Sequence, residues 1–427
     1  MPDTVQQRPP RPDRREQSQF VSIFALLASV LLLTAGTNLQ GVLLPLRRQL
    51  EGSSTQEIGL LSSGWSFGFV LACLTVGRLI SSVGHVRSFA GLAAVSGATS
   101  LLLLPLNDEA TWIVLRVVIG FCFGGLSLII ESWLNERSGN ARRGAIFAAY
   151  MTITLLASLC GTLSLAFLEP MDALPYTLMG VAVVLSIVPV ALTRAPLPKP
   201  VAPFSIKLGA LYRVSPSGVF GCFAVGLVSG ALGGLLPAYG LAMGLSTHAV
   251  AVLLAAALVG GALAYYPAGV LSDRIDRRIV IIALACLSAA LCGIVLLRPH
   301  LSSTGILFVV GAFGFCQYPL YGVCVAMTND RVREQSFSEI ASELLVVYGT
   351  GTVLGPPLAA AMMHYGERFL FLFMGVVLLL LASFTIARTR QTPRTPPELK
   401  CRHHPLGMAP NSMQRFRPRR DHEKADT

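Results

Sequence analysis

Residues Gly269–Arg278 read GVLSDRIDRR, and this segment separates two apolar runs that are each long enough to cross a bilayer. Five charged residues fall within six positions: Asp273, Arg274, Asp276, Arg277 and Arg278. A cluster of charge this dense cannot remain in hydrocarbon. The sequence therefore predicts a short turn at a membrane face, where Gly269 lets two helices approach closely and the arginines meet anionic head groups.

The composition is that of a membrane protein. Of the 427 residues, 53% are apolar and only 13% are charged, and the mean hydropathy is +0.64. Soluble globular proteins carry about 25% charged residues. The first apolar run follows a tail rich in proline and arginine and continues without a small-residue cleavage site. It therefore predicts a first span rather than a cleavable signal peptide.

No soluble segment of the sequence carries a catalytic triad order, a metal-ligand spacing or a phosphate-binding glycine loop. We therefore expect neither an enzyme nor a cofactor. Eight of the nine cysteines fall inside apolar runs, where they act as small hydrophobic residues. The ninth, Cys401, lies near His403 and His404 in the C-terminal tail. A metal site there is the alternative to a solvated tail; we favour the tail and predict no metal site.

Twelve apolar runs of about 20 residues each follow the N-terminal tail, the length that a ~30 Å hydrocarbon core requires. The predicted spans cover about 20–46, 57–80, 88–106, 111–134, 145–168, 174–193, 216–241, 248–271, 279–297, 304–327, 340–363 and 367–387. The tails at 1–19 and 388–427 are basic and rich in proline, and we expect them to be disordered. The predicted fold class is an all-α membrane protein with twelve transmembrane helices.

The distribution of charge sets the orientation. With the N-terminus inside, 28 of the 33 lysines and arginines fall on the inner side. Four fall outside, Arg47, Arg48, Arg298 and Arg368, and Arg116 lies within the fourth span. This positive-inside bias predicts a multi-pass membrane protein with both termini in the cytoplasm. The net charge of +11 is then a topology signal and an attraction to anionic lipids, not a nucleic-acid footprint.

The two halves of the chain form an internal repeat. Matching positions lie 192 residues apart in the first spans and 194 apart later: GVLLPL at 41–46 with GGLLPA at 233–238, Gly77 with Gly269, Gly120 with Gly314, and Gly161 with Gly355. The repeat predicts two like-oriented six-helix bundles, at 20–193 and 216–387, with a substrate site near the midplane between them. The cytoplasmic linker at 194–215 begins with prolines, and its segment 204–213 predicts a short interfacial helix.

Several motifs carry a family resemblance. The charged turn has the pattern G-x-x-x-D-R-x-(G/D)-R-(R/K), the fourth span carries Arg116-x-x-x-Gly120-x-x-x-Gly124, and the eleventh carries Gly351-x-x-x-Gly355-Pro356-Pro357. With IIESWLNERSGNARRGAIFAAYM (129–151) and YPLYGVCVAMTNDR (318–331), they resemble the YcaD-like branch of bacterial major facilitator superfamily permeases over most of residues 20–387. The resemblance implies a twelve-helix transporter of the bacterial inner membrane. The first-half turn GRLISSVGHVR (77–87) departs from the family pattern, with Ser81 and His85 in place of the usual aspartate and arginine.

The resemblance and the charges together predict an inner-face gating motif. Its members are Gly77, Arg78, Gly84, Arg87, Glu131, Gly269, Asp273, Arg274, Arg277, Arg278 and Glu343. We expect Asp273 to complement a helix N-terminus near Arg143 and Gly144, and Glu131 to pair with Arg78 or Arg87. Such ion pairs would hold an outward-open form. The alternative is that these residues only fix the topology and solvate the interface.

Polar and aromatic residues near the middle of the spans are candidates for the substrate site. They are Asn38, Gln40, Trp65, Arg116, Gln317, Tyr318, Tyr321 and Tyr348. Each one alone is also compatible with an interhelical hydrogen bond or an interfacial belt. Arg116 either attracts an anionic substrate group or modulates a proton site, or it snorkels outward past Trp112. Tyr265-Tyr266-Pro267 is interpreted as a bend in the eighth span.

Glycine spacing at Gly120, Gly124, Gly351 and Gly355 predicts close helix packing, and Pro356 predicts a hinge in the eleventh span. The function predicted from these patterns is transport of a small organic solute or drug-like compound by alternating access. The predicted partners are that small-molecule substrate and membrane lipids, and we expect a monomer.

Several alternatives stay open at this point. No acid lies at the centre of a span, so proton coupling would use Glu131, Glu343 or another acid at a span end, and a uniporter is the alternative. A multiply charged anion is disfavoured because only one arginine is embedded. Efflux and uptake are both compatible with the sequence. The rival from another class is a non-transporting receptor or scaffold on the same fold.

Overall fold

The computed structural model describes residues 14–137, 143–192, 208–298, 301–331 and 337–389, and the regular structure in these ranges is helical. The first half contains α1 (Arg14–Leu50), α2 (Thr55–Val83), α3 (His85–Leu102), α4 (Glu109–Arg137), α5 (Arg143–Ser164), the short 3-10 helix η1 (Leu165–Phe167), α6 (Leu174–Leu185) and α7 (Ile187–Ala191). The second half contains α8 (Leu208–Val214), α9 (Pro216–Ala242), α10 (Thr247–Arg274), α11 (Arg277–Leu297), α12 (Ser303–Asn329), α13 (Phe337–Met363) and α14 (Phe369–Thr389). Most of both predicted tails, and the first part of the predicted linker, lie outside the described residues.

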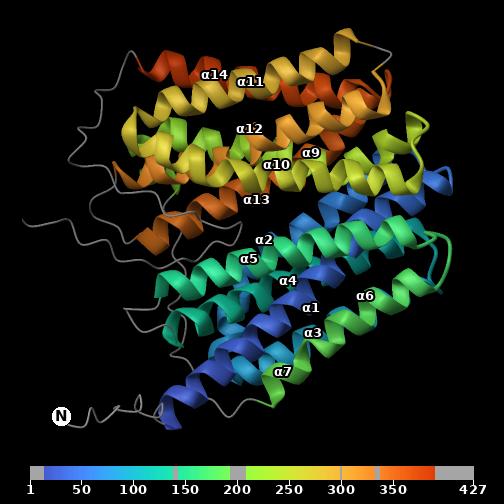
Figure 1. The fold of residues 1–427 in the computed structure, drawn as a ribbon, viewed down its shortest axis with the longest axis vertical. Helices are drawn as coiled ribbons and strands as arrows, with labels where there is room; N and C mark the ends of the chain where they lie inside the picture. Colours follow the sequence, from blue (N-terminus) through green and yellow to red (C-terminus); the bar gives the residue numbers. More distant parts are fainter. Residues whose placement is uncertain (1–13, 138–142, 193–207, 299–300, 332–336, 390–427) are drawn as a thin grey trace, which may run out of the picture.

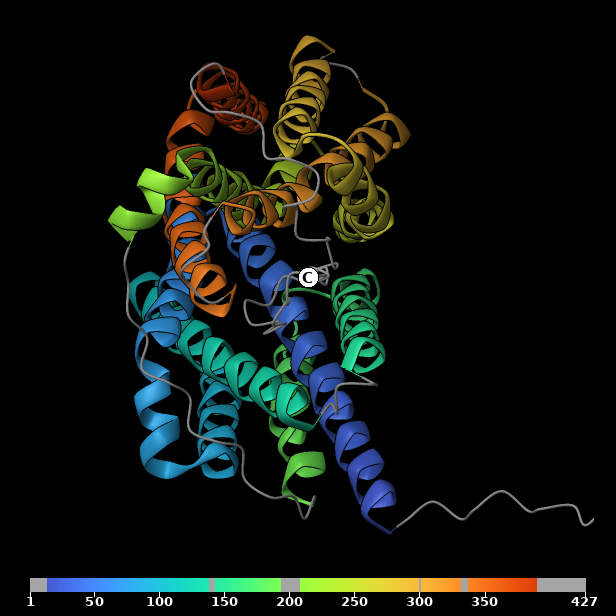
Figure 2. The same ribbon diagram turned by 90° about the vertical axis from the view of Figure 1, so that its left-hand side faces the viewer.

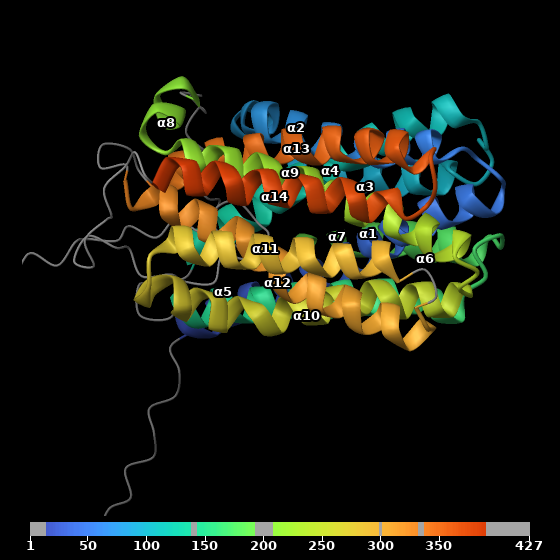
Figure 3. The same ribbon diagram turned by 90° about the horizontal axis from the view of Figure 1, so that it is seen from above.

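The helices form two bundles, α1–α7 and α9–α14, which lie one above the other in Figures 1 and 2. Figure 3 shows the long helices running side by side along one direction, with α8 set apart at one end. Within the described ranges, eleven helices are long and apolar enough to cross a membrane. The remaining predicted span is α3, which packs against α4 and α6 and is more polar because it carries His85, Arg87 and several serines. The predicted twelve-helix fold is confirmed.

Two predicted elements differ locally from the structure. The sixth span is divided at Ser186, whose hydroxyl donates to the carbonyl of Val183 at 2.6 Å, so α6 and α7 are separate helices. The interfacial helix of the linker is α8, with Leu211 buried and Tyr212 45% exposed.

The end of each span that the charge bias assigns to the cytoplasm is called the inner end below, and the opposite end is called the outer end.

Equivalent turns at the outer end display the repeat. Gly52 and Gly244 have φ angles of 81° and 79°, a conformation that glycine adopts without steric strain. Two residues later, Ser54 and Ser246 cap α2 and α10. Each serine hydroxyl accepts the backbone N–H three positions further on, at 3.3 Å and 3.2 Å. Both pairs are 192 residues apart, as the sequence repeat requires.

Close helix packing repeats in the same way. A Cβ on Gly120 would overlap the carbonyl oxygen of Trp65 in α2, and a Cβ on Gly314 would overlap that of Ala257 in α10. The helix pairs α2–α4 and α10–α12 are therefore built on the same backbone contact, which only glycine permits.

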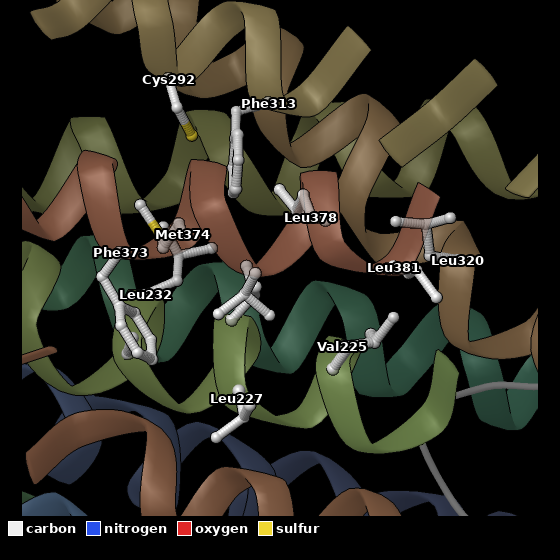
Figure 4. Packing of buried hydrophobic residues seen from close by; sticks show 14 of the residues in the cluster. Val225, Leu227, Leu232, Cys292, Phe313, Leu320, Phe373, Met374, Leu378 and Leu381 are labelled. Atoms are coloured by element: carbon white, nitrogen blue, oxygen red, sulfur yellow. The ribbon is translucent and has the colours of Figure 1, made fainter. Parts of the chain in front are cut away.

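The remaining glycines of the predicted packing motif also lie against neighbouring helices. Gly124 faces Ala72 and Phe69 of α2, and Gly351 and Gly355 face the backbone of α9. The second bundle has a continuous apolar interior, and Figure 4 shows side chains of α9, α12 and α14 gathered in it, including Val225, Phe313 and Leu378. Because lipid tails are as apolar as these side chains, close van der Waals contact holds each bundle together.

The first span extends beyond its predicted end and takes Arg47 and Arg48 into α1. Both are buried because Glu51 accepts Arg47 Nε at 2.8 Å and Arg48 Nη1 at 3.1 Å. Their guanidinium groups also lie 5.1 Å above the ring of Tyr176 and 4.7 Å above that of Trp112. Burial raises the pKa of Glu51, but hydrogen bonds from the two arginines outweigh that effect and lower the pKa overall.

The two bundles meet chiefly along α2 and α13, toward the outer end. A Cβ on Gly59 would lie 3.0 Å from the carbonyl oxygen of Pro356, and Ser63 Oγ donates to the carbonyl of Val353 at 2.6 Å. Nearer the surface, Val250 of α10 belongs to an apolar cluster with α1 and α4. At the inner end, the described ion pairs of Arg277 are with Asp273 and Asp330 of the same bundle. We describe this arrangement as outer-closed.

Candidate functional site

Tyrosines of the second bundle form one side of the candidate site. Tyr321 of α12 and Tyr348 of α13 contact each other, with ring centroids 4.8 Å apart. The ring of Tyr318 packs against Gly261 of α10, where a Cβ would lie 2.5 Å from its Cδ2 atom. The three tyrosines predicted from the sequence therefore lie where α10, α12 and α13 adjoin.

Tyr265 is a member of this group that the sequence interpretation missed. α10 continues as one helix through Pro267 to Arg274, so the predicted bend does not interrupt it. Tyr265 lies one turn after Gly261, and its phenol is near enough to those of Tyr318 and Tyr348 to interact electrostatically. The spacing of four residues from Gly261 is the sequence signal that places Tyr265 on the face of α10 toward α12.

Gln317 is buried more deeply than the tyrosines beside it. Its side chain is 1% exposed, and neither its amide nitrogen nor its amide oxygen has a hydrogen-bond partner among the described residues. A buried amide without partners is unfavourable by about 1–3 kcal/mol. A water molecule or a substrate group that reached Gln317 would therefore be held strongly.

Aromatic residues of the first bundle form the other side. Trp65 stacks on Phe69 one turn away in α2, with centroids 5.6 Å apart, and lies 5.5 Å from Phe123 of α4. The indole N–H of Trp65 is buried and has no acceptor among the described residues. Asn38, in contrast, donates to the carbonyl of Thr34 in its own helix at 2.9 Å.

Arg116 and Gln40 contact each other inside the first bundle. Arg116 Nη1 donates to Gln40 Oε1 at 3.3 Å and its Nε donates to the carbonyl of Leu61 at 3.5 Å. Gln40 in turn donates to Ser100 Oγ at 3.1 Å. Arg116 is 5% exposed and points into the bundle, so the alternative that it snorkels outward past Trp112 is wrong.

The inner-face motif of the second bundle is organised around Arg277, which is 2% exposed. Its guanidinium donates to Asp330 at 2.7 Å and 3.3 Å and lies 3.4 Å from Asp273. Asp276 caps α11 by accepting the backbone N–H of Arg278 at 3.0 Å. Asp330, at the end of α12, was not among the predicted site residues because no spacing rule links it to the charged turn.

Two other members of that motif differ in burial, since Arg274 is exposed and Arg278 is buried. The predicted contact of Asp273 with Arg143 and Gly144 involves side chains outside the described residues. It stays a prediction.

The first-bundle part of the motif is more open. Gly84 joins α2 to α3 with a φ of 92°, and a Cβ on Gly77 would meet no neighbour within 4 Å. Arg78 and Arg87 are exposed. Glu131 is 2% exposed and accepts the phenol of Tyr150 at 3.4 Å, so the described contact of this carboxylate is with α5.

Two further features bear on the predicted mechanism. Glu343 is 1% exposed and lies in the second turn of α13, and α13 is one helix through Pro356 and Pro357. Among the described residues, no group of three or more histidine, cysteine, aspartate or glutamate side chains has a metal-binding arrangement. A small pocket of about 80 Å³ at the outer end of the second bundle, lined by residues such as Tyr239 and Arg368, is separate from both aromatic groups.

Comparison with known proteins identifies the family. The sequence profile of the Major Facilitator Superfamily matches residues 26–214 and 218–416. An uncharacterized MFS-type transporter YcaD from Escherichia fergusonii is 27% identical over 375 residues, which cover 87% of this chain and 96% of that protein. The YcaD protein of Salmonella arizonae is 26% identical over 373 residues, covering 86% and 96%.

Solved structures share the fold. A bacterial homologue of the human lysosomal transporter Spinster, in an inward-facing and occupied conformation, has a TM-score of 0.72 at 15% identity and covers 92% of this chain and 99% of its own. The nucleoside transporter NupG has a TM-score of 0.71 at 10% identity, covering 87% and 99%. At these identities the likeness concerns the fold.

Proposed function

The chain belongs to the major facilitator superfamily, and from that premise we propose that it moves a small organic solute or drug-like compound across the bacterial inner membrane by alternating access. Transport is the activity of the family, which is not a class of enzymes. For this chain in particular, the class of compound and the driving force are the parts of the proposal that go beyond the activity of the family.

The observation that supports a small organic substrate is the pair of aromatic groups on opposite bundles. Trp65, Phe69 and Phe123 lie in the first bundle, and Tyr321 and Tyr348 lie in the second. Binding sites for small organic molecules combine apolar and aromatic walls with a few polar groups. Gln317 and the tyrosine hydroxyls supply such groups here. An apolar or aromatic compound with few hydrogen-bonding atoms fits this chemistry.

Alternating access is supported by the distribution of contacts between the bundles. The contacts of α2 with α13 extend from the outer end, at Ser63, to the middle of the spans, where Gly349 lies against Val70. The exposed Arg78 and Arg87 are at the inner end. We interpret the outer-closed arrangement as the inward-facing state. In the outward-facing state, the inner-face motif would close and Ser63 would separate from Val353.

Proton coupling is the driving force that we favour, and Glu131 is the proposed carrier. It is a buried carboxylate within reach of Tyr150, and Glu343 holds a comparable position in α13. An acid of this kind can load and release a proton when its surroundings change between two states. In proteoliposomes, a pH step should accelerate flux, and Glu131→Gln should remove that response. A uniporter would carry the same flux with and without the pH step.

The deciding experiment for the function is flux itself. Screening a deletion strain for growth and drug susceptibility identifies candidate compounds. Flux measurements on the purified protein in proteoliposomes then show whether the protein moves them. A receptor or scaffold on this fold would move none. Substrate protection of a cysteine is the supporting measurement. Cys73 suits it better than Cys316, because Cys73 is half-buried whereas Cys316 is only 2% exposed.

A further inference from the structure

Arg116 is a buried cation whose charge has no counterion in the described structure. The two hydrogen bonds from its guanidinium go to neutral oxygens, at 3.3 Å and 3.5 Å, and both are long for an N–H donor. No carboxylate of the described residues lies within ion-pair distance of it. Burying a charge is unfavourable unless it is paired and hydrogen-bonded. The arrangement leaves three of the five guanidinium N–H groups for another partner.

Other buried arginines of the chain show what a paired site looks like. Arg47 lies 2.8 Å and Arg48 3.1 Å from the carboxylate of Glu51. Arg277 lies 2.7 Å from Asp330. Each of them has a charged partner at normal hydrogen-bond distance, and Arg116 does not. Because it has no charged partner among the described residues, Arg116 is a candidate binding site for an anion.

The fold itself does not require the polar residues around Arg116. By the repeat offsets of 192 and 194, the positions of Gln40, Trp65 and Arg116 correspond to Leu232, Ala257 and Val310 in the second bundle. The second bundle builds the same helix contact, Gly314 on Ala257, with these apolar residues in place. Helices can therefore pack in this way without Gln40, Trp65 and Arg116. Binding of a ligand is a role that would explain these three residues.

From this geometry we propose that Arg116 binds the carboxylate of the transported compound, which is an organic monoanion with an aromatic or apolar body. The proposal rests on the transport function above and names its substrate class. Arg116 and Phe123 are seven residues apart in α4 and share one face of that helix. Trp65 lies beside Phe123 and offers an indole N–H that has no acceptor among the described residues.

The anion would thus receive the guanidinium and the indole N–H, while the rings of Phe69 and Phe123 contact the body of the molecule. Only one negative charge of the compound would be paired with a cation, because the second bundle has Val310 at the position that corresponds to Arg116. Charge-assisted hydrogen bonds in a dry site are stronger than neutral ones, so a carboxylate should outbind an uncharged group of the same shape.

Calorimetric titration of the full-length protein in lipid nanodiscs tests this proposal. The probes are 2-naphthoate and 2-naphthamide, which share a ring system and differ in charge at pH 7. For the unmodified protein we expect 2-naphthoate to bind about 10- to 100-fold more tightly. Arg116→Gln should make the two affinities equal. Trp65→Phe, which keeps an aromatic ring but loses the N–H donor, should reduce the preference by a smaller factor. Arg298→Gln, at an exposed arginine of the outer end, is the matched control and should keep it.

Equal affinities in the unmodified protein, no binding of 2-naphthoate, or a preference that survives Arg116→Gln would each overturn the proposal. If Arg116→Gln does not elute as a single species in gel filtration, the Trp65→Phe variant and the probe pair on the unmodified protein decide the question. Flux measurements separate this inference from the proposed function. Flux of neutral compounds without an anion preference refutes the inference alone, whereas absence of flux for every compound named by the deletion screen refutes the transport function.

Discussion

The hydrogen bond between Ser63 and Val353 is the contact whose removal makes the most direct test of the outer-closed arrangement. Pro357 has no N–H, so the carbonyl of Val353, four residues earlier in α13, lacks its normal intrahelical donor. Ser63 Oγ from the opposite bundle supplies that donor at 2.6 Å. The bond exists only while the outer ends of α2 and α13 are together. Its energy therefore contributes to the balance between the two states.

Replacing Ser63 by alanine should shift that balance toward the outward-facing state. In the outer-closed arrangement the Val353 carbonyl would be left buried without a donor, a cost of about 1–3 kcal/mol. In the outward-facing state, water can reach the same carbonyl and the cost disappears. At 1.4 kcal/mol for each factor of ten, the ratio of outward- to inward-facing molecules should rise roughly 5- to 140-fold.

Double electron–electron resonance between spin labels at the inner ends measures that ratio. Val83 of α2 and Leu271 of α10 are exposed and lie in opposite bundles, so cysteines placed there in a cysteine-free background report inner closure. Ser62→Ala is the matched control, because Ser62 Oγ donates to Ile58 in its own helix at 3.0 Å. The Ser63→Ala variant should gain the short inner distance, and the Ser62→Ala variant should not.

A second substitution checks the physical reason. Pro357→Ala restores an N–H to α13 and gives the Val353 carbonyl a donor within its helix. In that background the effect of Ser63→Ala should shrink markedly, which a double-mutant cycle would detect as a coupling energy. The reasoning fails if Ser63→Ala leaves the distance distribution unchanged, or if its effect is the same with and without Pro357.

The remaining predictions concern the charged groups. Arg277→Gln leaves Asp330 buried without its guanidinium and should cost about 3–5 kcal/mol of stability, seen as a lower melting temperature than for Arg274→Gln at an exposed neighbour. The pKa of Glu51 is lowered in the folded state, so its pairing stabilises the protein above the unfolded carboxyl pKa and is lost as pH falls through the lower, folded value. Melting temperatures in acid should therefore decline less for Glu51→Gln than for the unmodified chain. Asp273→Asn should lower flux while leaving the amount of protein in the membrane unchanged, and equal flux would contradict the proposed inner lock.

The fold could be predicted because its signals are periodic and redundant. Length and apolarity indicated each span, and the charged turns set their limits. The repeat at offsets of 192 and 194 residues reappears in the structure as paired contacts, such as Gly120 with Trp65 and Gly314 with Ala257. The weakest span by composition, α3, was still recognised as one of the twelve apolar runs, at about 88–106. Periodic signals of this kind can be recognised in a single sequence.

Site geometry was less predictable, because it depends on contacts between distant residues. Asp330 reaches Arg277 across 53 positions, and no local pattern indicates that pair. The fourth tyrosine, Tyr265, was hidden by the proline two residues later, which suggested a bend. Arg47 and Arg48 were assigned to a loop because charges usually end a span, whereas Glu51 and two aromatic rings keep them inside α1. In each case a tertiary partner overrides the local preference.

The burial of Arg277 also narrows how an inner lock could operate. Its pairing with Asp330 fixes the charged turn to α12 within one bundle, and breaking such a buried pair costs about 3–5 kcal/mol. If the inner lock included this pair, each transport cycle would have to supply the free energy to break it. Arg274, Arg78 and Arg87 are exposed, so they can exchange water for a carboxylate at little cost. The exposed arginines are therefore better suited than Arg277 to change partners between states, whereas the pair of Arg277 with Asp330 joins α11 to the end of α12 within the second bundle.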